Sequence, residues 1–175
     1  MPFEPWQPGM RVTALRLASI SPTWQDWTPV WTTSTGAGAP SFGDASVTAR
    51  WAQAARTVFW RLEITFGATT NFGGGGSADN WRMTAPVTAA GTALVCGQGE
   101  IQAGNTPSGY PNVAGTRQGL RVRLTTATHL EFEMSTGNIG SINSSSGAGL
   151  IDAVTPWPWT AGAALRAWGQ YESAT

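Results

Sequence analysis

The chain has 175 residues, the size of one domain with room for an additional tail, and ten arginines balance ten acidic residues to give zero net charge. Only 11% of the residues are charged, and such a chain lacks the surplus of positive charge that contacts to nucleic-acid phosphates require. Ten tryptophans argue against intrinsic disorder. Since no apolar run approaches the roughly 20 residues of a membrane-spanning helix, we expect neither a nucleic acid nor a membrane as a partner.

The first 23 residues differ in pattern from the rest and are predicted to form an attachment arm. Prolines at positions 2, 5 and 8, followed by Gly9, predict an extended segment because proline cannot continue a regular hydrogen-bonded element. A short helix is predicted over residues 14–20, with Thr13 as its cap and Pro22 as its end. Two helical turns are marginal alone in water, so this segment needs a packing partner. The candidate docking residues are Trp6, Leu15, Leu17 and Ile20.

From Trp24 onward the hydrophobic period becomes two, which predicts β-strands. The clearest strand is 58–66, where Val58, Trp60, Leu62, Ile64 and Phe66 alternate with polar or less buried positions. Seven or more short strands joined by turn-rich segments, with no useful helical period, predict an all-β fold: an antiparallel β-sandwich of the jelly-roll type over residues 24–175. The other predicted strands contain residues 27–31, 47–52, 80–85, 94–97, 120–124, 129–134 and 165–172, and Gly97 and Gly99 are expected to mark a bulge or a close approach of backbones.

The strands at 120–124 and 129–134 form the clearest predicted hairpin. A three-residue loop at 126–128 keeps both apolar sets on one face and places Arg123 opposite Glu131 and Arg121 opposite Glu133. Opposite charges on cross-strand neighbours stabilise such a pair by roughly 0.2–1 kcal/mol each. The charged side chains are expected on the outer face of the hairpin.

No set of residues indicates catalysis, a metal or a cofactor, and we expect a protein that is not an enzyme. The single histidine, His129, is expected at the surface of a strand. Glu131 and Glu133 are the one close pair of acids that glycoside hydrolysis could use, but their arginine neighbours favour a structural ion ladder. The glycines at 73–76 precede a strand rather than a helix, which favours a turn over a phosphate loop. Cys96 stands alone in an apolar stretch and is expected to be a small buried side chain.

The tryptophans divide into two groups. Trp51, Trp60 and Trp81 fall on the inward faces of predicted strands and are expected in the core. A second group is less clearly internal, and we favour a subunit interface or the core for it, with a sugar-stacking platform as the alternative. This group comprises Trp157, Trp159 and Trp168.

The segment Trp24-Gln25-Asp26-Trp27-Thr28-Pro29-Val30-Trp31 resembles the Trp-x-x-Tyr-Thr-Pro-x-Trp opening of β-rich domains in virion proteins of tailed bacteriophages, which are frequent in phages of actinobacteria. The similarity continues through the strand at 58–66 and the turn Thr69-Thr70-Asn71-Phe72-Gly73. It closes with Pro156-Trp157-Pro158-Trp159 and Gly169-Gln170-Tyr171-Glu172, so that it covers about residues 24–173.

This resemblance implies a virion structural protein, a homotrimeric jelly roll displayed on the tail tip, a fibre or the capsid. We expect a tail accessory, fibre or minor tail protein that docks on other virion proteins through residues 1–23. Its β-domain, residues 24–175, would then face the host surface, including cell-surface carbohydrate. A capsid decoration protein on the phage head is the alternative, and a virion-associated glycan-degrading enzyme is a third and weaker one.

Overall fold

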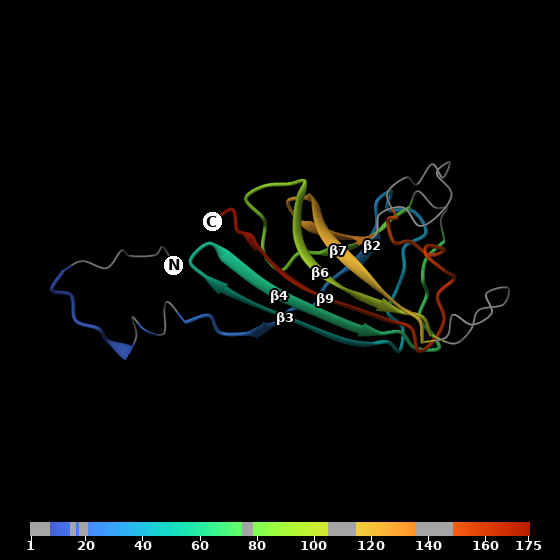
Figure 1. The fold of residues 1–175 in the computed structure, drawn as a ribbon, viewed down its shortest axis with the longest axis horizontal. Coiled ribbons are helices and arrows are strands. Elements are labelled where there is room, and N and C mark those ends of the chain that lie inside the picture. The colour runs from blue at the N-terminus through green and yellow to red at the C-terminus, as the bar shows by residue number, and fades with distance from the viewer. Residues whose placement is uncertain (1–7, 15–16, 18–20, 75–78, 105–114, 136–148) are drawn as a thin grey trace.

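The computed structural model describes residues 8–14, 17, 21–74, 79–104, 115–135 and 149–175. In this part of the chain nine strands form one sheet in which every pair of neighbours is antiparallel, in the order β1-β3-β4-β9-β6-β7-β8-β5-β2 (Figure 1). The all-β expectation is therefore confirmed. The strands are β1 (Gln25–Asp26), β2 (Trp31–Thr33), β3 (Ser46–Ala54), β4 (Thr57–Thr65), β5 (Trp81–Thr84), β6 (Leu94–Gln102), β7 (Arg117–Thr126), β8 (His129–Met134) and β9 (Ala164–Glu172).

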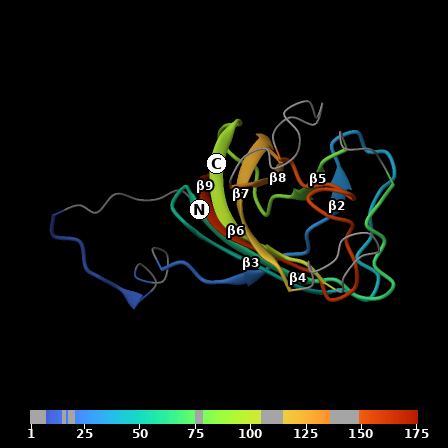
Figure 2. The same ribbon diagram turned by 45° about the vertical axis from the view of Figure 1, so that its right-hand side comes forward.

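The sheet curls on itself (Figure 2). Strands β1 and β2 occupy its two opposite edges, although only residues 27–30 separate them in the chain. A chain covers at most about 3.6 Å per residue, so the two edges must lie close together. The connecting segment is hydrogen-bonded at both ends: Trp27 N–H donates to the Ala49 carbonyl, and Thr84 N–H donates to the Val30 carbonyl, each at 3.0 Å. The observed architecture is thus a single curled antiparallel sheet with its core on the inner side.

The core is built from the inward positions of the strands, as the alternation in β4 predicts. Val58, Trp60, Leu62 and Ile64 are buried, while Arg61 and Glu63 between them are exposed. One end of the core is an aromatic cluster centred on Trp81, whose ring centroid lies 4.7 Å from that of Trp31 and 4.8 Å from that of Trp159. Burial of such rings is the largest apolar contribution a small core can make. The other members of the cluster are Phe66 and Phe72.

The register predicted for the β7–β8 hairpin is confirmed. Arg121 pairs with Glu133 and Arg123 pairs with Glu131 across the two strands. The loop is one residue tighter than expected, because Thr126 already pairs with His129 and the register shifts by one residue just before it. This β-bulge accommodates the additional residue and preserves the predicted pairing.

Two glycines mark a close approach of β6 and β9, as predicted for this region of β6. Gly97 pairs with Gly169, and a register shift beside Gly97 marks a bulge in β6. A methyl group added to Gly169 would lie 2.0 Å from the Cys96 carbonyl oxygen, and one added to Gly97 would lie 2.7 Å from the ring of Trp60. The absence of side chains at these positions lets the Trp60 ring cover the junction of the two strands.

Two buried side chains near this junction, Cys96 and Tyr171, make the free energy of unfolding depend on pH in the alkaline range. Burial raises the pKa of the Cys96 thiol to about 12, and burial also raises the pKa of Tyr171 to about 12. The Tyr171 hydroxyl donates to the Val87 carbonyl at 2.6 Å and accepts from the Val87 N–H at 3.1 Å. The ordinary pKa values are 9.0 and 10.0, so both groups favour folding in their neutral forms. Their contribution is complete below pH 9 and is lost as the pH rises toward 12.

We therefore expect the free energy of unfolding, measured by urea titration at several pH values, to fall between pH 9 and 12. In Tyr171→Phe the decline above pH 10 should be shallower than in the wild type, because one of the two ionisations has been removed. The variant should also be less stable at neutral pH by about 1 kcal/mol, the net value of a typical hydrogen bond. An unchanged slope above pH 10 would contradict the assignment to Tyr171.

Candidate binding surface

The outer face of the sheet carries rows of polar and charged side chains around the exposed Trp168. Trp168 of β9 pairs with Arg61 of β4 on one side and with Gln98 of β6 on the other, so these three residues form a row across three strands. The Trp168 side chain is 51% exposed. Because residues paired across antiparallel strands share a face, the indole is flanked by a cation and an amide.

A second row lies on the same face, two residues further along each strand. Arg166 of β9 pairs with Glu63 and with Glu100, and Glu100 in turn pairs with Gly119 of β7. Arg166 Nη1 lies 2.9 Å from Glu100 Oε1 and 3.2 Å from Gln102 Oε1. These contacts fix the guanidinium of Arg166 over β6.

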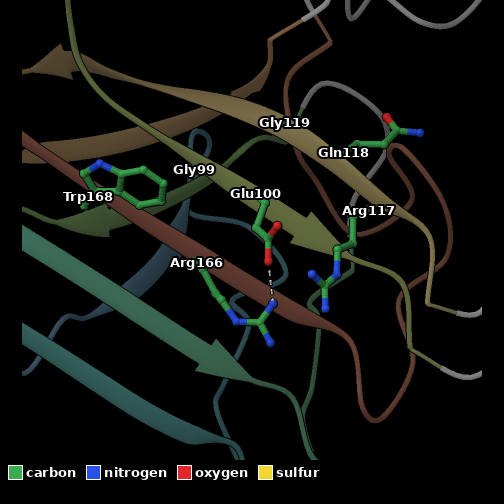
Figure 3. Close-up of a pocket in the computed structure, with 7 residues that line it drawn as sticks. All are labelled: Gly99, Glu100, Arg117, Gln118, Gly119, Arg166 and Trp168. Carbon is green, nitrogen blue, oxygen red and sulfur yellow. Dashed lines mark hydrogen bonds and ion pairs between the residues drawn. The ribbon is translucent and has the colours of Figure 1, made fainter.

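The two rows border a shallow hollow of about 360 Å³ over β9, β6 and β7 (Figure 3). Trp168 and Arg117 flank the Glu100–Arg166 ion pair in this view, while the Gln118 side chain points away from it. Gly119 contributes no side chain to the floor of the hollow, and a methyl group added there would lie 3.4 Å from the Ser135 hydroxyl. We call this feature the β9-β6-β7 hollow; its lining residues are Gly99, Glu100, Arg117, Gln118, Gly119, Arg166 and Trp168.

A second exposed tryptophan, Trp24, extends the polar face toward the start of the domain. The guanidinium carbon of Arg61 lies 5.8 Å from the ring centroid of Trp24, within the range of a cation–π contact. Trp24 is itself exposed. Trp24, Arg61 and Trp168 therefore alternate aromatic and cationic groups along the outer face.

Of the three tryptophans that the sequence left between core and surface, the structure places two in the core. Trp157 and Trp159 are buried, with ring centroids 6.1 Å apart. The Trp159 indole N–H donates to the Asp152 carbonyl at 2.8 Å. Only Trp168 among the three presents its ring to solvent, so a sugar-stacking or interface role of this group rests on Trp168.

The acidic pair of β8 is buried, which corrects the expected position on a solvent-facing side. Glu131 is 3% exposed and Glu133 is 2% exposed. Glu133 is bound by both Arg121 and Arg123, so Arg123 does not bind the residue directly opposite to it. Glu131 is bound instead by an arginine of the neighbouring strand β5, since Arg82 Nε lies 2.8 Å from its Oε2.

Two further hydrogen bonds are donated to the Glu131 carboxylate, so both of its oxygens have partners within the fold. Asn80 Nδ2 donates at 3.1 Å and Thr125 Oγ1 donates at 2.7 Å. A general acid or a nucleophile must face its substrate, whereas both carboxylates here face arginine and amide groups of the fold. This geometry is that of a structural ion network.

His129 lies at the start of β8 and is partly buried. Its Nδ1 is 2.9 Å from the Thr128 hydroxyl and 3.3 Å from the Thr126 hydroxyl. Burial, together with the positive charge of Arg82, lowers the pKa of this imidazole. Among the described residues, no group of three or more histidine, cysteine or acidic side chains is arranged to hold a metal ion.

Most of the predicted docking arm lies outside the described residues, including Trp6, Leu15 and Ile20 and most of the helix expected over 14–20. Leu17 is described and 51% exposed. Its N–H donates to the Thr13 carbonyl at 3.0 Å, and its carbonyl accepts from the Ser21 N–H at 3.1 Å. Residues 21–24, which precede β1 and join the arm to the sheet, are all exposed.

Comparison with known proteins gives no match to a family model, to a curated protein or to a solved structure. In the part of the chain that the structure describes, no helix is long and apolar enough to cross a membrane.

Proposed function

We propose that this chain is a structural protein of a tailed-bacteriophage virion, of the tail accessory or fibre type. Residues 1–23 dock on another virion protein, and residues 24–175 present a jelly-roll-like β-domain to the host surface. The observation that carries this proposal is the described part of the arm, residues 8–14, 17 and 21–23, which lies away from the curled sheet (Figure 1). It exposes Val12 by 58% and Leu17 by 51%. Burial of these two apolar side chains against another virion protein would stabilise the docked arm.

A homotrimer is part of the same proposal. The start of β6 exposes Leu94 and Val95 next to each other. The chain has few charges and no net charge, a composition that favours association over a dispersed monomer. A threefold assembly would cover such apolar side chains with copies of the same surface.

A structural role also agrees with the state of the acidic residues. Glu131 and Glu133 are both occupied by arginines of neighbouring strands. A glycan-degrading enzyme would need a second, accessible pair of carboxylates. The arginine contacts of Glu131 and Glu133 support a structural role for this pair of acids.

A capsid decoration protein is the second candidate, because an exposed arm can equally lie across capsid subunits. In that case the β-domain would cover the head rather than face the host. Both candidates require the arm for attachment, and they differ in where on the particle the chain is found.

The arm is tested by deletion of residues 1–20. We expect the truncated chain to fold, because the strands and the buried core all lie after residue 24. We also expect it to be absent from purified particles when it replaces the full-length chain during phage growth. Circular dichroism of the purified truncated chain checks the fold, and immunoblotting of the particles checks incorporation. Incorporation at the level of the full-length chain would contradict the role of the arm.

A further inference from the structure

We propose that the β9-β6-β7 hollow binds an acidic saccharide chain, with one sugar ring packed on Trp168 and a carboxylate bound by Arg117. This inference extends the proposed function, since a displayed β-domain would meet the carbohydrate of a host surface.

The stacking group is Trp168. Its indole is half-exposed in the middle of a nine-residue strand, held between two paired neighbours on β4 and β6. The rigid, flat and amphipathic ring suits the apolar face of a sugar ring, while the side chains around it suit the hydroxyl groups at the edge of the sugar. A hollow of about 360 Å³, lined in part by Gly99 and Gly119, is large enough for one or two such rings.

The charge of the hollow selects an acidic ligand. Two arginines, Arg117 and Arg166, and one acid, Glu100, leave one unit of positive charge in the lining. Arg166 is engaged by Glu100 at 2.9 Å. Arg117 is exposed, and no carboxylate of the described residues lies within 4.0 Å of it. An exposed arginine without an acidic partner is suited to a bidentate contact with a ligand carboxylate.

Two competing ligands fit less well. A nucleic acid would need a run of cations along the groove, whereas Glu100 stands at the centre of the hollow. An extended peptide would need a free sheet edge for main-chain hydrogen bonds, whereas β9, β6 and β7 are interior strands.

The test is binding of the purified full-length chain to an array of immobilised glycans in which chains bearing uronic or sialic acid are paired with neutral counterparts. We expect binding to acidic chains in preference to their neutral counterparts. Trp168→Ala should weaken this binding about tenfold or more, which corresponds to about 1.4 kcal/mol. Arg117→Gln should abolish the preference for the acidic member of each pair.

The controls are Val30→Ala, which removes an exposed apolar side chain outside the hollow, and Arg11→Gln, which removes an exposed arginine of the arm. Both should bind like the wild type, and thermal unfolding verifies that each variant is folded. Arg117→Gln tests the site at an exposed position even if Trp168→Ala does not fold. Absence of any acidic preference, or equal loss in variants and controls, would overturn the inference. The position of the chain on the particle is measured separately, so failure here is distinguishable from failure of the proposed function.

Discussion

Replacing Trp81 with alanine is expected to lower the free energy of unfolding by about 3–5 kcal/mol, the range for deletion of a large buried aromatic side chain. Trp81 is fully buried and lies at the centre of the aromatic cluster, between Trp31 and Trp159. Its indole N–H also donates to the Phe72 carbonyl at 3.2 Å. The substitution leaves a cavity among rings that belong to four different parts of the chain, and that cavity cannot close without moving several strands.

The matched control is Trp168→Ala, the same chemical change on the outer face. Because Trp168 is half-exposed, its removal should change the stability by no more than about 0.5 kcal/mol. Urea titrations of the two variants, followed by circular dichroism, give both values. Similar losses in both variants would contradict the arrangement of inner and outer faces.

Replacing Glu133 with alanine is expected to cost about 3 kcal/mol, the lower end of the range for breaking a buried ion pair. The substitution removes the one carboxylate that binds both Arg121 and Arg123. The side chains of these arginines are 40% and 35% exposed, so each can recover part of its hydration. This recovery keeps the expected loss at the lower end.

The control for this variant is Glu172→Ala, which breaks an ion pair of 3.2 Å with Arg56 at the surface. Both partners of that pair are more than half exposed, and exposed pairs contribute at most about 1 kcal/mol. Equal and small losses at the two positions, measured by urea titration, would show that the Glu133 network is not a buried one.

Local features of the fold were predictable because neighbouring residues determine them. The alternation in β4 marks its buried face, and the opposite charges of β7 and β8 fix the hairpin register. Gly97 and Gly99 indicate the bulge and the close contact of β6 with β9, because a side chain there would collide with backbone atoms or with Trp60. Each of these predictions needs only a period, a charge pattern or a steric requirement.

Features that depend on distant segments were not predictable. The curl of the sheet follows from β1 and β2 lying at opposite edges, which no local pattern encodes. Glu131 looks solvent-facing in the hairpin alone, but Asn80 and Arg82 come from a segment about fifty residues earlier and enclose it. Trp159 likewise becomes a core residue because it packs on Trp81.

The candidate site was predictable in part. Trp168 was among the tryptophans considered for a surface role, and its position in an alternating strand is the signal for exposure. Arg117 was missed, although it continues the alternating series of Arg121 and Arg123 along β7. Its role depends on the register of β7 with β6, which places it opposite Gln102 and next to the Glu100–Arg166 pair.

The location of the chain on the phage particle tests the proposed function most directly. Purified particles would be labelled with gold-conjugated antibodies against residues 24–175 and examined by electron microscopy. We predict label on the tail. Label confined to the head would contradict the tail assignment in favour of capsid decoration, and particles without label would contradict a virion role altogether.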